Sequence, residues 1–191
     1  FRFPKNFDAP YKSATITEFW RRWHISLSSW LRDYLYISLG GNRRGRWRTY
    51  LNLMLTMLLG GLWHGAALRF VLWGALHGVA LALHKAWLSI VPKARKAGRD
   101  MHPVVRLLGI IFTFHIVCFG WLLFRAESMQ EVHLMLYQIF HNFNTAIIGQ
   151  VVTGYGVIFA LIAAGYVMHF MPESVDMKLS QKVGEAGFWW Q

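Results

Sequence analysis

Acidic side chains are scarce in this sequence. Nine Asp and Glu stand against twenty Lys and Arg, which gives a formal net charge of +11. None of the nine falls in the four long apolar stretches of the chain, residues 50–62, 70–91, 107–124 and 151–171. Carboxylates inside membrane spans are a mark of proton relays. Their absence argues against a carboxylate-based relay like those of ion pumps.

Cysteine is almost absent as well. Cys118 is the only one in the 191 residues, so no intrachain disulfide and no thiolate metal cage can form. The sequence also lacks a Gly-rich phosphate loop, an H-E-x-x-H zinc motif and a G-x-S-x-G nucleophile elbow. We therefore expect no bound metal or cofactor, although histidine ligation of a metal or haem stays an alternative.

Apolar residues, by contrast, make up 55% of the chain, and only 15% of residues are charged. This composition is typical of an integral membrane protein. We predict an all-α polytopic membrane protein with about four transmembrane helices, one for each apolar stretch, and further interfacial helices. The expected organisation is an interfacial region over 1–48, a core membrane region over 49–126, and a last region over 127–191 with an interfacial helix, a span and a cytoplasmic tail. Because the chain begins at Phe1 in a basic, aromatic segment, we expect it to be part of a longer protein.

The basic residues cluster beside the apolar stretches. Ten lie between Arg2 and Arg48, and six more between Lys85 and Arg106. This pattern predicts cytoplasmic loops that face anionic lipid headgroups, and it disfavours a nucleic-acid partner. Two interpretations of Arg43 and Arg44 stay open: a topology signal alone, or a site that also steers an anionic donor such as a coenzyme A phosphate.

An amphipathic helix is predicted from Thr15 onward. Thr15 and Glu18 form a capping box at its start. Aromatic and aliphatic residues then recur at spacings of three and four from Trp20 to Tyr34, and arginines cover much of the opposite face, which is the pattern of a helix in the membrane interface. His24 follows Trp20 by one turn, so we expect its imidazole to point inward with the aromatic face.

The second notable histidine lies in the segment Gly60-Gly61-Leu62-Trp63-His64-Gly65. No residue with a formal charge occurs from Thr49 to Leu68, about 30 Å of helix. An ionisable side chain at membrane depth is costly, so a functional role is the default hypothesis for His64. Gly60 and Gly61 indicate either a break in the helix or a close contact with another helix. A straight helix would put His64 about 24 Å beyond Arg48, and unwinding at the glycines would put it near mid-membrane.

Imidazole titrates near neutrality, so it can take a proton from an attacking hydroxyl and return it to a leaving group. Acyl transfer from a thioester to an alcohol needs such a shuttle. We therefore select His64 and His24 as candidate catalytic residues. His77 is expected either to line the same cavity or to be structural, and Trp63 to pack on His64 or on a substrate. The rival interpretation is a non-catalytic channel, transporter or scaffold whose histidines are structural.

Two segments resemble a known family. FWRRWHISLSSWLRDYLYISLGGNRRG at 19–45 and LLGGLWHGAALRFVLWGALHG at 58–78 are similar to the membrane-bound O-acyltransferase (MBOAT) superfamily, and within it to bacterial subunits that acetylate alginate, cellulose or peptidoglycan. The resemblance is strong over 1–87 and weak at 119–126. Two departures stand out: Ala67-Leu68-Arg69 replaces Asn-Trp-Thr, and Ser38 replaces a proline.

The resemblance implies a membrane-embedded tunnel in which the position of His64 is catalytic and that of His24 is a second site position. It implies that an acetyl group from a cytoplasmic donor, with acetyl-CoA expected, passes to a polysaccharide acceptor outside the bacterial inner membrane. A periplasmic acetyltransferase partner protein and an amino-terminal half of the same protein, absent from this chain, are the further expected partners. The arginine at position 69 leaves the acceptor geometry open.

Overall fold

The structure is a computed structural model that describes residues 4–90, 102–172, 174–175, 178 and 181–182. It divides into two compact units, residues 1–143 and 144–191. Within the described residues every regular element is helical. The basic positions Lys93 to Arg99 and most of the expected cytoplasmic tail lie outside the described residues.

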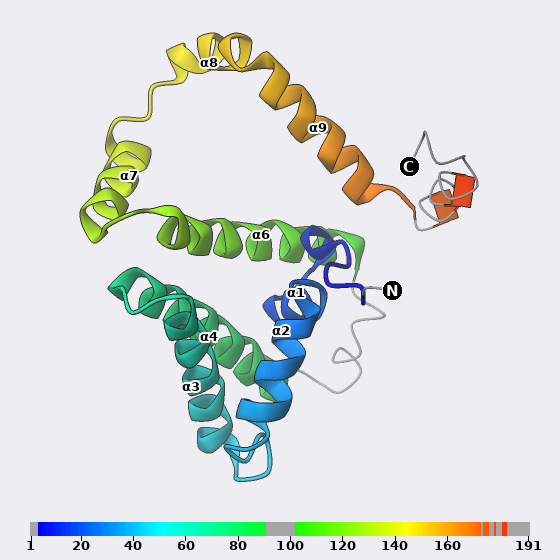
Figure 1. The fold of residues 1–191 in the computed structure, drawn as a ribbon, viewed down its shortest axis with the longest axis vertical. Helices are drawn as coiled ribbons and strands as arrows, with labels where there is room; N and C mark the ends of the chain where they lie inside the picture. The colour runs from blue at the N-terminus through cyan, green and yellow to red at the C-terminus, as the bar shows by residue number, and fades with distance from the viewer. Residues whose placement is uncertain (1–3, 91–101, 173, 176–177, 179–180, 183–191) are drawn as a thin grey trace. The chain divides into compact units, whose positions relative to one another are not determined.

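In its described residues, the first unit contains four short helical elements followed by four longer helices (Figure 1). The short elements are the 3-10 turn η1 (Pro10–Lys12), α1 (Ile16–Arg22), α2 (Ile25–Trp30) and the π-helix η2 (Leu31–Tyr36). The longer helices are α3 (Arg46–His64), α4 (Leu68–Ile90), α6 (Pro103–Arg125) and α7 (Met129–His141). This order confirms the helical membrane fold class.

The start of α1 confirms Thr15 as the N-cap, and the Glu18 carboxylate returns to the residue before the N-cap instead of to the N-cap itself. The Glu18 amide donates to the Thr15 hydroxyl oxygen at 3.1 Å, and the Glu18 carboxylate in turn accepts from the Ala14 amide at 2.9 Å. The helix does not continue through residue 34 as the periodicity indicated. It stops at Arg22, and His24 adopts a left-handed conformation with φ 43° and ψ 58° before α2 begins.

Hydrogen bonds to Asn6, a residue far from the break in the sequence, explain why the helix is interrupted between α1 and α2. The carbonyl oxygen of Asn6 accepts from the Ile25 amide at 2.9 Å, and its side-chain oxygen accepts from the Ser26 amide at 3.0 Å. These are the first two amides of α2, which have no partner within their own helix. Asn6 therefore replaces the hydrogen bonds that a continuous helix would make, and the arm before α1 caps α2.

Ion pairs hold the same arm against α1. The Arg22 guanidinium lies 3.6 Å from the Asp8 carboxylate and 3.1 Å from that of Glu18. A hydrogen bond from Lys5, with the charges of Lys5 and Arg22, lowers the pKa of Asp8. The Asp8 carboxylate therefore stays charged to lower pH than an ordinary aspartate, and the attachment of the arm persists in mild acid.

We expect Asn6→Ala to destabilise the fold by about 0.5–2 kcal/mol, because the substitution removes the acceptor that caps α2. The thermal unfolding midpoint of the detergent-solubilised protein measures this loss. Asn6→Asp is the matched control, since it keeps an acceptor oxygen at the same position. An unchanged midpoint in Asn6→Ala would show that the cap contributes nothing.

A buried asparagine joins the turn after η2 to α3. Asn52 is fully buried, and its amide donates to the Gly41 carbonyl at 3.0 Å. Gly41 has φ 52° and Gly40 has φ 106°, so the Gly-Gly pair supplies the left-handed backbone that the turn requires. The turn thereby directs the chain into α3.

Gly60 and Gly61 do not break α3, which continues to His64. Instead they permit close contact with other helices, above all with α4, which packs against α3 as an antiparallel hairpin (Figure 1). A Cβ on Gly61 would overlap the carbonyl of Phe70, and one on Gly74 would overlap the carbonyl of Met57. Two positions were predicted for His64. The structure has the one that a straight helix predicts, because His64 lies at the end of α3 opposite to Arg48.

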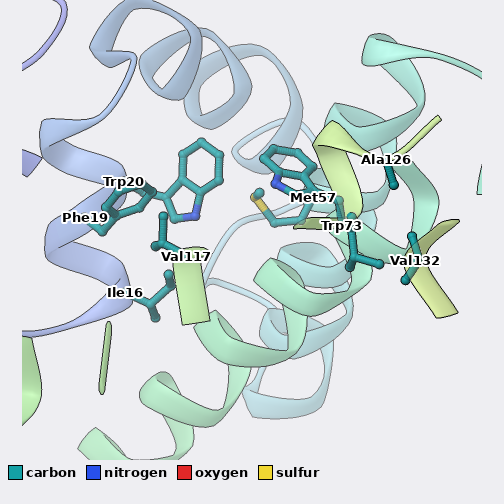
Figure 2. Packing of buried hydrophobic residues seen from close by; sticks show 9 residues of the cluster. Ile16, Phe19, Trp20, Met57, Trp73, Val117, Ala126 and Val132 are labelled. Carbon is teal, nitrogen blue, oxygen red and sulfur yellow. The ribbon is translucent and has the colours of Figure 1, made fainter. Parts of the chain in front are cut away.

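The core of the first unit is aromatic. Figure 2 shows Trp20 of α1 and Trp73 of α4 on either side of Met57 of α3, with Val117 of α6 nearby. The two indole rings make an edge contact with centroids 5.8 Å apart. This cluster joins α1, α3, α4 and α6, and it therefore supports the positions of both candidate histidines.

Two helices in the described part of the chain, α4 and α6, are long and apolar enough to cross a membrane. The fourth expected span, over 151–171, is broken: α8 (Ile148–Gly154) and α9 (Gly156–Phe170) follow the turn η3 (Thr145–Ile147) and meet at an 87° bend. They count as one further span only if taken together. The remaining expected span, 50–62, lies in α3. The first turn of α3 carries Arg46 and Arg48, and α3 is not among the described helices that are long and apolar enough to cross a membrane.

Candidate active site

The His64 imidazole lies in a corner made of aromatic rings. Its centroid is 4.8 Å from that of Trp63, 5.0 Å from Phe124, 5.4 Å from Trp73 and 6.3 Å from Phe70. The first three are edge contacts. The side chain is half-buried, and its ring nitrogens have no hydrogen-bond partner among the described residues. A ring that is held on several sides, with its nitrogens uncommitted, is free to exchange a proton with a bound substrate.

His24 lies at the junction of α1 and α2. Its imidazole is half-buried, lies 6.1 Å from the Phe7 ring and has Nδ1 3.4 Å from the Ser26 hydroxyl oxygen. A left-handed backbone is uncommon for a residue with a side chain and costs energy. Such strained positions cluster at functional sites, which makes the conformation of His24 a reason to look for a function.

Aromatic contacts link the segment that carries His24 to the corner that holds His64. The Trp20 ring, one turn before His24, contacts the Trp73 ring, and the Trp73 ring contacts His64, although 40 residues separate the two histidines in the chain. The two imidazoles make no ring contact with each other among the described aromatic pairs.

The two other candidates near His64 differ in exposure. Trp63 contacts His64 yet keeps 67% of its surface exposed, so it can meet another molecule. His77 is 1% exposed and packs on Trp20 and Trp73, with ring centroids 5.2 and 4.8 Å away. The Trp73 ring lies between His77 and His64, because it contacts both. His77 thus supports the wall of the site from behind.

Arg43 and Arg44 are exposed and lie before α3, whereas His64 ends that helix. The 19 residues of α3 make the two ends about 27 Å apart. The structure therefore does not bring these arginines to the candidate catalytic residues. Any contact of theirs with a substrate takes place at a distance from the reacting atoms.

A cavity of about 1830 Å³ lies between α1, α4 and α6. Its walls are mostly apolar, with Arg21, His84 and Arg106 among the polar residues, and neither His24 nor His64 is among its described lining residues. His84 is tied to α1 through a 2.7 Å hydrogen bond with the Thr17 hydroxyl. We therefore base the candidate site on the aromatic corner and not on this cavity.

Sequence reasoning missed several residues of the corner. Phe70, Trp73 and Phe124 lie in apolar stretches where lipid-facing and site-facing aromatics look alike. Asn6 was passed over because its partners are 19 and 20 residues further along the chain. Only the weak FGWLLFRA similarity at 119–126 pointed toward Phe124.

The chain is similar in sequence to several known membrane acyltransferases. The chain is 54% identical over 145 residues to the "Probable alginate O-acetylase AlgI" of Pseudomonas aeruginosa, covering 76% of this chain and 26% of that protein. It is 44% identical over 131 residues to the peptidoglycan O-acetyltransferase of Helicobacter pylori, covering 68% and 24%. It is 30% identical over 137 residues to the teichoic acid D-alanyltransferase of Bacillus subtilis, covering 68% and 34%.

The chain therefore spans about a quarter to a third of the length of these relatives. The model of one family matches residues 4–123, which is more than half of the chain and includes α1 to α4 and nearly all of α6. That stretch contains every residue of the aromatic corner except Phe124, which follows it directly. The chain belongs to the MBOAT, membrane-bound O-acyltransferase family.

Proposed function

We propose that the full-length protein is a membrane O-acetyltransferase that moves an acetyl group from a cytoplasmic donor, acetyl-CoA, toward an extracytoplasmic polysaccharide such as alginate. The aromatic corner that holds the half-buried His64, linked through Trp73 to Trp20 in the helix that precedes His24, carries this proposal. Relatives named alginate O-acetylase and peptidoglycan O-acetyltransferase support the reaction class.

In the proposed reaction the neutral imidazole of His64 accepts the proton of the acceptor hydroxyl. The hydroxyl oxygen forms a bond to the carbonyl carbon of the acetyl thioester, and the carbon–sulfur bond then breaks. The imidazolium returns its proton to the departing thiolate, so the products are an acetyl ester and a free thiol. His24 orients the acceptor or serves as a second proton carrier. General acid–base transfer of this kind contributes about 10²–10⁴-fold to a rate.

The other residues take supporting roles in this proposal. Trp63 offers its exposed ring to the acyl group or the sugar. Arg43 and Arg44 attract the anionic donor at the opposite end of α3, and His77 backs the Trp73 wall. The protein resides in the bacterial inner membrane, where a periplasmic partner protein completes transfer to the polymer.

Transfer of labelled acetyl groups tests the function directly. Membranes that contain the full-length protein, its periplasmic partner and the acceptor polysaccharide are supplied with acetyl-CoA labelled in the acetyl group. We expect label in the polymer, and none with membranes that lack the protein. Absence of transfer by abundant, folded protein would favour the channel or scaffold interpretation.

A substitution at His24 tests the second imidazole. His24→Asn removes the ring, but Asn tolerates the left-handed backbone that this position requires. We expect the transfer rate to fall by about tenfold or more with little change in the thermal unfolding midpoint. His133→Asn, at an exposed histidine of α7, is the control. A parent-like rate in His24→Asn would remove this imidazole from the mechanism.

A further inference from the structure

Arg69 connects two helices at the edge of the aromatic corner. It lies in the first turn of α4, five residues after His64, and its Nη1 donates to the Phe124 carbonyl at 2.9 Å. That carbonyl belongs to the last turn of α6, where carbonyl groups have no partner within the helix. A cation at this end of a helix is also favoured by the helix dipole. Arg69 thus caps the C-terminal end of α6, although it precedes Phe124 by 55 residues in the chain.

The same guanidinium holds one of the rings. Its central carbon lies 4.1 Å from the centroid of Phe70, a cation–π arrangement. Phe70 packs on Phe124 with centroids 5.1 Å apart, and both rings contact His64. One side chain therefore touches the ring of Phe70 and the backbone of Phe124, the two phenylalanines of the corner.

The surroundings of Arg69 give it no other evident task. It has no carboxylate partner among the described ion pairs, and its Nε is buried without a hydrogen-bond partner. Burying part of a charged group without full pairing is costly. The Phe124 carbonyl and the Phe70 ring are what hold it there.

We propose that Arg69 is a positioning residue for acyl transfer. By tying the start of α4 to the end of α6, it fixes the Phe70–Phe124 wall that sets the orientation of the His64 ring. This inference rests on the proposed function of His64. It also gives a role to Arg69, which replaces the threonine that the resemblance to the MBOAT superfamily predicts at this position. A base displaced from its productive geometry loses rate even when it is chemically intact.

Two substitutions of Arg69 separate geometry from charge. Arg69→Lys keeps the charge but loses the planar guanidinium that can stack and donate at a fixed angle, and Arg69→Met loses both. In the purified full-length protein we expect each to lower kcat for acetyl transfer by about tenfold while KM for acetyl-CoA stays within about twofold. Arg125→Met, at an exposed arginine of the same α6 end, is the matched control.

A second measurement does not depend on activity. The rate at which diethyl pyrocarbonate modifies His64, followed by peptide mass spectrometry, reports how firmly the corner holds the ring. We expect faster modification in Arg69→Met than in the parent and in Arg125→Met. Parent-like kcat with parent-like modification would overturn the proposal, as would a loss of kcat that only follows the loss of folded protein. If His64→Gln retained full activity, the proposed catalytic role of His64 would fail, yet the modification rates would still decide whether Arg69 orients His64.

Discussion

Replacement of His64 by glutamine is expected to reduce acetyl transfer by about 10²–10⁴-fold, because the substitution removes the proposed general base. Glutamine keeps a polar side chain of similar reach, and it cannot exchange protons near neutral pH. The loss should therefore appear in kcat more than in KM for acetyl-CoA. Stopped assays with labelled donor and purified full-length protein measure both constants.

The control for this substitution is His133→Gln. His133 is exposed on α7 and lies beyond the stretch that the family model matches. Equal abundance and equal unfolding midpoints in the two variants show that neither change affects folding. A His64→Gln protein that retains a rate within about twofold of the parent would exclude imidazole catalysis at this position.

The largest loss of stability is expected for Gly74→Ala. In a helix interior, alanine makes the folded state more stable than glycine does by about 0.5–1 kcal/mol, so the substitution is favourable wherever space allows. At Gly74 the new Cβ would overlap the Met57 carbonyl and lie 3.1 Å from the Leu58 Cα, and backbone atoms cannot rotate away. The hairpin of α3 and α4 must then separate, at a net cost of about 1–3 kcal/mol.

Gly165→Ala in α9 is the matched control, because a Cβ there meets nothing within 4 Å. We expect its unfolding midpoint to equal or exceed that of the parent, whereas Gly74→Ala should lower the midpoint and the yield of monodisperse protein. The separation should also displace His64, which ends α3, so the specific activity of surviving Gly74→Ala protein should fall too. Equal midpoints in the two variants would contradict the close packing of the hairpin.

The parts of this protein that could be predicted from sequence are those with local or compositional causes. The Thr15–Glu18 capping box and the helical membrane class are of this kind, as is the pair Gly60-Gly61, for which close helix contact was one of two readings. The interruption at His24 was not foreseeable, because the periodic pattern of 20–34 runs through it and its cause is Asn6. The bend near Tyr155 did have a local signal, the glycines on either side of it.

The candidate site divides in the same way. His64 and His24 were selected because ionisable rings are conspicuous among apolar residues, and the chemistry of imidazole suggested that they work together. The walls were not foreseen: Phe70 and Phe124 differ in no local way from aromatics that face lipid. Which rings surround an imidazole is a property of how α4 and α6 cross, and that crossing depends on contacts such as Arg69 with Phe124.

The unbroken course of α3 gives the chemistry a direction. A strongly basic turn leads into this helix and the proposed base ends it, so under the proposed function donor attraction and reaction take place at opposite ends of one helix. Under the proposed function, a carrier bound at the basic end would have to extend its activated group along the length of α3, about 27 Å, before any bond can change. In such an arrangement the protein would also form the path of the acyl group, and transport along the helix would be part of the proposed reaction.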